Sequence, residues 1–232
     1  LDLHNYCRRF MNNEHTLIGN NGLTIEDLAS FWQAIAKEFS TFKNIYGYGL
    51  MNEPHDLAPE TKWFDMAQAS INAIREVDTN TLIMVGGNDW SSAERWIEQS
   101  DTLKFLKDPA NNLAFEAHVY FDKDASGTYK YSYEEEECYP EKGIDRVKPF
   151  VEWIKQNKFH GFIGEYGIPD NDPRWNETLD LFLGYLQENG INGTYWAAGP
   201  WWDTYFMAIT PKDGKDRPQM PIIEKYTSTL KK

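Results

Sequence analysis

The chain has few cysteines, fewer basic than acidic residues and no long apolar run, and each absence excludes a class of protein. Among its 232 residues only Cys7 and Cys138 are cysteines, too few for a Cys-x-x-Cys metal site. A single disulfide between them stays open, because pairing cannot be read from a sequence. No run of about 18 apolar residues is present, so the sequence predicts no membrane-spanning helix.

Acidic side chains dominate the charge, with 36 Asp and Glu against 23 Lys and Arg and a formal net charge of −13. This balance argues against nucleic acid or an anionic membrane surface as a partner. It fits a neutral substrate, although acidity that only aids solubility is an equally good explanation. Leu1 stands where an initiator methionine is usual, so we expect a chain that has been cut or processed.

Aromatic residues are abundant, with 9 Trp, 13 Tyr and 13 Phe, or 15% of the chain. Their rings fill hydrophobic cores, and they also stack on the apolar faces of sugars. Only aromatic residues that are predicted beside polar loop residues therefore indicate a binding site.

Short apolar runs alternate with amphipathic segments along the whole sequence. Strands are predicted at residues 1–4, 45–51, 82–85, 113–117, 162–163 and 193–196, and helices at about 25–39, 63–77, 146–156 and 176–188. Thr24, followed by Asp27, predicts a capping box at the start of the first helix. The alternation predicts an α/β fold with a parallel sheet, and residues 1–232 contain no linker or repeat that would divide them into domains.

Polar and aromatic residues follow one predicted strand after another, as in Asn52-Glu53-Pro54 and Gly164-Glu165-Tyr166-Gly167. In a (β/α)-barrel of the TIM type, the carboxyl ends of the strands converge on one face, where the active site is built. An open doubly wound sheet would gather such residues only at its switch point. Many such sheets also carry a Gly-rich phosphate loop, which this sequence lacks. The barrel is therefore the predicted fold.

Glu53 and Glu165 are the candidate catalytic residues, because each follows an apolar run where a charged side chain is costly unless it is used or paired. Two carboxylates across a cleft can hydrolyse a glycosidic bond, and in retaining enzymes they stand ~5–5.5 Å apart. One attacks the anomeric carbon, while the other protonates the leaving oxygen and later activates water. For either Glu taken alone, a structural salt bridge is the alternative.

Five further side chains suit the same task. Asn52 can hydrogen-bond a sugar 2-hydroxyl, Tyr120 can donate to the nucleophile, and Trp196 offers a flat face for a sugar ring. His4 and His118 can supply polar contacts. A turn role for Asn52 and a core role for either histidine are the alternatives.

Four more aromatic residues are candidates for sugar-stacking positions beside the cleavage point. Trp90 follows one predicted strand, Trp201 and Trp202 follow another, and Tyr6 follows the first. Packing within loops would explain each of them equally well.

Five motifs resemble those of glycoside hydrolase family 5, and of its endo-β-1,4-glucanases in particular. In family order, and across essentially the whole chain, they are Leu1-Asp2-Leu3-His4-Asn5-Tyr6, Gly49-Leu50-Met51-Asn52-Glu53-Pro54-His55, His118-Val119-Tyr120, Gly164-Glu165-Tyr166-Gly167 and Tyr195-Trp196-Ala197-Ala198-Gly199. The resemblance implies a double-displacement mechanism with Glu53 as acid/base and Glu165 as nucleophile. It implies a β-glucan polysaccharide or oligosaccharide as substrate and no metal or organic cofactor. It also matches the family's other active-site positions to His4, Asn52, His118, Tyr120 and Trp196.

The resemblance begins at the family's third strand, so this chain would hold about six of the eight strand-helix units of a TIM-type barrel. An active-site Arg that the family carries on its second strand has no counterpart here. A barrel without two strands exposes unpaired edges and part of its apolar interior. We therefore expect a homo-oligomer that covers the gap.

Three alternatives stay open. A divalent metal could bind His4, Glu53, His118 and Glu165, although the sequence has no His-x-His pair. A non-catalytic carbohydrate-binding barrel would result if the absent units removed activity. A mannanase, xyloglucanase or lichenase would use the same chemistry on another polymer. The acidic composition and a polymeric substrate together suggest secretion.

Overall fold

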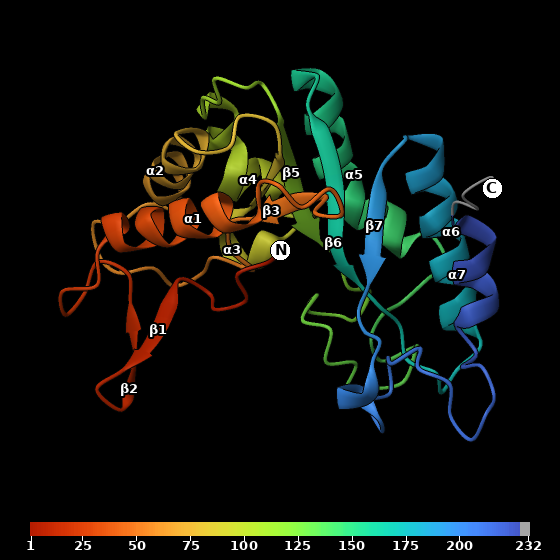
Figure 1. The fold of residues 1–232 in the computed structure, drawn as a ribbon. Helices are drawn as coiled ribbons and strands as arrows, with labels where there is room; N and C mark the ends of the chain where they lie inside the picture. Colours follow the sequence, from red (N-terminus) through yellow and green to blue (C-terminus); the bar gives the residue numbers. More distant parts are fainter. Residues whose placement is uncertain (228–232) are drawn as a thin grey trace.

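The computed structural model describes residues 1–227, and its elements form a curled parallel sheet flanked by helices (Figure 1). Along the chain these elements are β1 (Arg8–Met11), β2 (Glu14–Leu17), α1 (Ile25–Phe39), β3 (Gly47–Gly49), α2 (Trp63–Arg75), β4 (Leu82–Gly86), α3 (Asn88–Ser91), α4 (Trp96–Ser100), η1 (Asp101–Phe105), β5 (Leu113–His118), α5 (Lys142–Asn157), β6 (His160–Tyr166), α6 (Arg174–Glu188), β7 (Asn192–Tyr195), η2 (Pro200–Trp202) and α7 (Met220–Tyr226). Consecutive helices pack on each other, α1 on α2, α5 on α6 and α6 on α7.

Five parallel strands form the main sheet in the order β3-β4-β5-β6-β7. Each strand pairs with the next one along the chain, as in a TIM-type barrel, and the sheet curls into a half-barrel. The predicted α/β barrel type is therefore confirmed, as a partial barrel. Among the described residues, β3 and β7 form its two edges (Figure 1).

The strand predicted at residues 1–4 does not form: the segment runs beside β3, but it pairs with the sheet only through an isolated parallel bridge between Asp2 and Gly49 and a few backbone hydrogen bonds. The N–H of Leu3 donates to the Gly49 carbonyl at 3.3 Å. The chain then turns away, with φ of 58° at both Tyr6 and Cys7. The sheet consequently has five strands plus this bridged segment instead of the six strands that were predicted.

The helix predictions rest on local signals and agree well with the structure. The α1 helix begins after Thr24, whose side chain accepts from the N–H of Asp27 at 3.2 Å, while the Asp27 carboxylate accepts from the N–H of Thr24 at 2.8 Å. This is the predicted capping box. The α5 helix begins earlier than predicted, at Lys142.

The β1–β2 hairpin was not predicted, although the sequence carries a signal for it. Asn12 and Asn13 form its two-residue turn, with φ of 52° and 65°. Asparagine tolerates this left-handed region better than most residues, which makes it common in tight hairpin turns. The hairpin stands away from the main sheet on the side to which the strands point (Figure 1).

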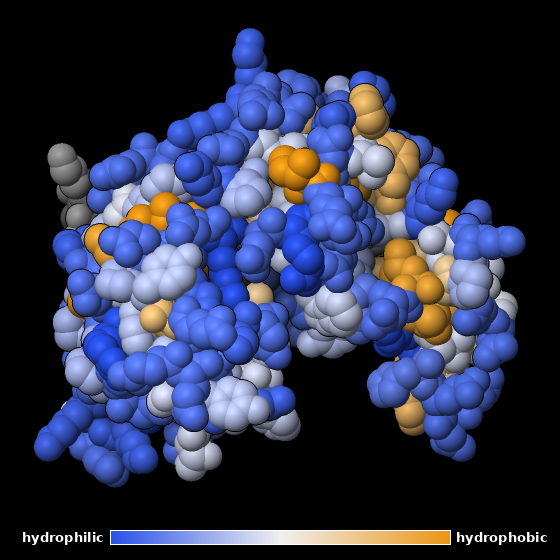
Figure 2. Space-filling model, turned by 180° about the vertical axis from the view of Figure 1, so that it is seen from behind, coloured by the Kyte–Doolittle hydropathy of each residue, from blue (hydrophilic) through white to orange (hydrophobic). Residues whose placement is uncertain are grey.

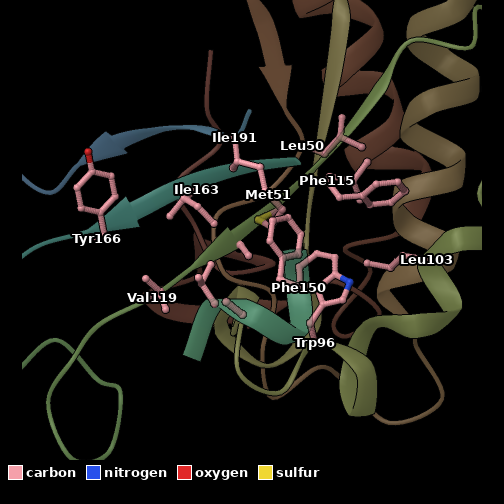
Figure 3. Packing of buried hydrophobic residues seen from close by; sticks show 14 of the residues in the cluster. Leu50, Met51, Trp96, Leu103, Phe115, Val119, Phe150, Ile163, Tyr166 and Ile191 are labelled. Carbon is pink, nitrogen blue, oxygen red and sulfur yellow. The ribbon is translucent and has the colours of Figure 1, made fainter. Parts of the chain in front are cut away.

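The hydrophobic core fills the space between the sheet and its helices, and aromatic rings make up much of it (Figure 3). The ring of Trp96 meets Phe150 edge-on at 4.6 Å, and Phe115 meets Trp153 edge-on at 4.9 Å. Such edge-to-face pairs stabilise a core beyond the area they bury. Most of the aromatic composition is therefore structural, and only a few aromatic residues remain for binding.

Cys7 and Cys138 are free thiols, so the disulfide left open by the sequence is not formed. Cys7 is fully buried, and this burial raises the pKa of its thiol to about 12. None of the described helices is long and apolar enough to cross a lipid bilayer.

Candidate active site

The predicted site residues gather at the carboxyl ends of the parallel strands. Glu53 follows β3 on a turn where its φ is 46°, His118 is the last residue of β5, and Trp196 follows β7. Glu165 lies inside β6, whereas the sequence placed it beyond a shorter strand at residues 162–163. This face is where catalytic residues of barrel enzymes are found.

A register shift between β5 and β6 determines where Glu165 points. Ala117 pairs with Ile163, but the next residue, His118, pairs with Glu165. Gly164 is thus the extra residue of a bulge, and bulges re-aim the side chains beside them. The bulge places Glu165 directly opposite His118.

Glu53, His118 and Glu165 form a compact cluster. One carboxylate oxygen of each Glu and one nitrogen of His118 lie within 4.8 Å of one another. The Nδ1 atom of His118 is 2.8 Å from Oε1 of Glu53 and 3.7 Å from Oε2 of Glu165. The two predicted carboxylates therefore lie close enough together to act on the same bond of a substrate.

Glu165 is buried and partly neutralised by its neighbours. The hydroxyl of Tyr120 donates to its Oε2 at 2.7 Å. Burial raises the pKa of Glu165 above its usual value, and the charge of Glu53 adds to the shift against the opposing effects of His118 and Tyr120. The repulsion between two carboxylates at this spacing is thus one of the causes of the raised pKa of Glu165.

His4 connects the N-terminal segment to the residue before Glu53. Its Nδ1 is 3.1 Å from Oδ2 of Asp2, and its Nε2 is 3.2 Å from both Nδ2 of Asn52 and the hydroxyl of Tyr6. With the proton on Nδ1, the ring donates to Asp2 and accepts from the other two. This network holds the Asn52 amide in place beside the two carboxylates.

The four predicted tryptophans are not equivalent. Trp196 stacks on His4 at 5.6 Å, and Trp202 meets Trp196 edge-on at 5.0 Å. Trp90 stacks on His55 at 4.4 Å and is 41% exposed. Trp201 is 88% exposed and projects into solvent, and no aromatic ring of residues 1–227 pairs with it. The structure thus brings three of the four to the cluster and leaves Trp201 outside it.

Each of the two carboxylates lines a separate hollow. One, of about 290 Å³, is lined by Glu53, Trp90, His118 and Tyr120. The other, of about 550 Å³, lies on the inner side of the sheet and is lined by Glu165 among others. Figure 2 shows the molecule indented on the edge to which the strands point, amid a mostly hydrophilic surface.

Two residues of the surrounding site were not predicted. Glu116 lies within β5, with its Oε1 3.4 Å from Nε2 of His118. The available signal was its position two residues before His118, since alternate residues of a strand share a face. The other is His55, on which Trp90 stacks, and which is fixed by Asp56 at 3.0 Å.

The same cluster is the place where a cation would have to bind, since Glu53, His118 and Glu165 each direct a ligand atom toward a common point. His4, the fourth residue considered from the sequence, is not part of this group. Burial alone would lower the pKa of His118, but the surrounding carboxylates raise it well above its usual value. A protonated imidazole is no metal ligand. A cation at this point would have to displace that proton before the imidazole could bind it.

Comparison with known proteins gives a consistent result. Residues 1–201 match the model of the family described as cellulase (glycosyl hydrolase family 5). The endo-β-1,4-glucanase B of Emericella nidulans is 36% identical over 193 residues, which are 81% of this chain and 56% of that protein. The endo-β-1,4-glucanase B of Aspergillus niger is 33% identical over 97% of this chain and 65% of its own length. The chain thus spans 56% to 65% of these curated relatives.

Solved structures of endoglucanases share the fold. The Pseudomonas stutzeri endoglucanase Cel5A in complex with cellobiose superposes with a TM-score of 0.87 at 42% identity, covering 98% of this chain and 68% of that one. XacCel5A in complex with cellopentaose gives 0.86 at 37% identity, covering 98% and 72%.

Proposed function

Because the chain belongs to glycosyl hydrolase family 5, as its motifs predict, we propose that it hydrolyses internal β-1,4-glucosidic bonds of cellulose-type glucans by double displacement. The observation that carries this proposal is the spacing of Glu53 and Glu165, which have oxygens within 4.8 Å of each other. Retaining glycosidases hold their carboxylates at ~5–5.5 Å, whereas inverting enzymes need ~6.5–9.5 Å to admit a water molecule.

In the first step, one oxygen of Glu165 attacks the anomeric carbon as the bond to the leaving oxygen breaks. Glu53 gives its proton to that oxygen. In the second step, water attacks the anomeric carbon, Glu53 takes the water's proton, and the ester bond to Glu165 breaks. Tyr120 holds one oxygen of Glu165 at 2.7 Å, which leaves the other oxygen free to form the bond.

The sugar at the cleavage point would lie against residues of the inner hollow. We propose that Asn52 binds its 2-hydroxyl, that Trp196 stacks on its ring, and that His4 holds Asn52 in place. Tyr6, Trp90, Trp201 and Trp202 would contact neighbouring sugars. The endoglucanase names of the relatives, and the cellobiose and cellopentaose in two similar structures, favour a glucan over mannan, xyloglucan or mixed-linkage glucan.

A chromogenic aryl β-cellobioside distinguishes an enzyme from a carbohydrate-binding barrel. We expect the chain to release the chromophore, because both carboxylates are in place, and we expect EDTA treatment to leave the rate unchanged. A preparation that binds cello-oligosaccharides without releasing chromophore would contradict the proposal. A rate that EDTA abolishes and one divalent cation restores would instead support the metal alternative.

We also propose that a second copy of the chain covers the open inner face of the half-barrel. The edges β3 and β7 are unpaired with each other, and the face between them carries Tyr46, which is 71% exposed, with Met84 and Phe162. Light scattering behind size exclusion should therefore give twice the monomer mass at micromolar concentration. A monodisperse monomer would refute this arrangement.

Since a cellulose-type polymer is met outside cells, we propose that the enzyme acts there.

A further inference from the structure

Glu116 directs a carboxylate at the active site from within β5. Its side chain lies on the same face of the strand as that of His118, two residues later. Its Oε1 atom is 3.4 Å from Nε2 of His118, whose other nitrogen contacts Glu53 at 2.8 Å. The buried imidazole therefore has a carboxylate at each nitrogen.

The backbone of β6 leaves room for this carboxylate. A Cβ atom at Gly164 would lie 2.0 Å from Oε1 of Glu116, which is far inside van der Waals contact. Gly164 is also the extra residue of the bulge that places Glu165 opposite His118. Any residue with a side chain here would push the Glu116 carboxylate away from the histidine.

We infer that Glu116 is a positioning residue: it accepts the Nε2 proton of His118 and so keeps the Nδ1 side of the ring facing Glu53. This inference rests on the proposed function, in which Glu53 is the acid/base. A neutral imidazole with no partner at Nε2 can place its proton on either nitrogen. With Glu116 present, the proton at Nε2 is held, and the ring has one orientation.

The charge of Glu116 also affects how firmly the proton is held. His118 faces Glu116 from its own strand, Glu53 from the turn after β3 and Glu165 from β6, while Arg95 and Arg146 line the adjoining hollow. Burial lowers the pKa of His118, but the three carboxylates outweigh it and raise that pKa well above its usual value. Because this pKa is raised, the doubly protonated ring loses a proton only on the alkaline side, and Glu116 favours the neutral form that keeps the proton on Nε2; removal of its charge should make the loss occur at lower pH.

The variant Glu116→Gln tests the inference, because it keeps an acceptor oxygen and removes the charge. On an unactivated cello-oligosaccharide, the alkaline limb of kcat/KM should move to lower pH. At a fixed pH on the alkaline side, kcat/KM should fall about tenfold for each pH unit by which the limb moves, while KM changes by less than about twofold. Glu116→Asp, which restores the charge, should return the limb toward the wild-type position. Glu152→Gln, the same change on the exposed face of α5, should match the wild type.

A second measurement does not need activity. Imidazole ¹⁵N shifts of labelled protein report which nitrogen of His118 carries the proton, and at which pH it is lost. We expect a proton on Nε2 across the working range in the wild type, and a lower titration midpoint in Glu116→Gln. A wild-type His118 without a proton on Nε2, or an unchanged midpoint, would overturn the inference. If Glu53→Gln keeps full activity, it is the proposed function that fails. The two NMR results named above would overturn only the inference about Glu116.

Discussion

Replacing Glu165 by glutamine should reduce kcat by at least about a thousandfold, while the protein folds and still binds cello-oligosaccharides. The carboxamide has nearly the shape of the carboxylate and can still accept from Tyr120, which donates at 2.7 Å. It cannot, however, form the ester bond to the anomeric carbon. Turnover of cellotetraose measures the loss of kcat, and calorimetry measures the retained binding.

Azide rescue provides a control on the role of Glu165. In Glu165→Ala, azide can enter the space left by the carboxylate and attack the anomeric carbon of an activated β-cellobioside, giving the α-glycosyl azide. The same change at Glu188, at the exposed end of α6, should leave turnover and product unchanged. A kcat within about tenfold of wild type, or a β-azide from Glu165→Ala, would rule out Glu165 as the nucleophile.

The parts of the fold that the sequence predicts are those fixed by neighbouring residues. The capping box of Thr24 and Asp27 is a contact across three positions, so the start of α1 follows from a short stretch of sequence. The strand predictions were less accurate, because a strand forms only where a segment pairs with another part of the chain. The segment at residues 1–4 was predicted as a strand, but it lies beside β3 with a single bridge, from Asp2 to Gly49, and a few backbone hydrogen bonds.

In the candidate site, too, some features follow from local sequence and others depend on contacts between distant segments. Glu53 and Glu165 were predicted because a carboxylate that follows an apolar run is costly unless it is used or paired, and this argument needs only the sequence. The sequence could place Glu116 on the same strand face as His118, but not its contact with the imidazole, because that contact depends on a bulge in the neighbouring strand at Gly164. Register between strands distant in sequence decides which side chains meet, and no local pattern contains it. An incomplete barrel was expected from the missing motifs, although with about six strand-helix units where the sheet has five strands.

Glu53→Gln should have an effect that depends on the leaving group. For natural cello-oligosaccharides the leaving oxygen needs a proton, so kcat/KM should fall by about 10²- to 10⁴-fold, the usual contribution of general acid catalysis. For a dinitrophenyl β-cellobioside the leaving group departs without a proton, so kcat/KM should fall by less than about tenfold. Glu60→Gln, an exposed residue of the same loop, should affect neither substrate.

The use of kcat/KM is essential to this test, because Glu53 has a second task. After the leaving group departs, Glu53 would act as the base that activates water, so its loss also slows release of the sugar from Glu165. With the activated substrate, kcat would then report this slow second step, and the glycosyl-enzyme would accumulate as a burst of chromophore. The kcat/KM value reports only events up to the first irreversible step, which is departure of the leaving group. Equal losses of kcat/KM on both substrates would show that Glu53 does not donate the proton.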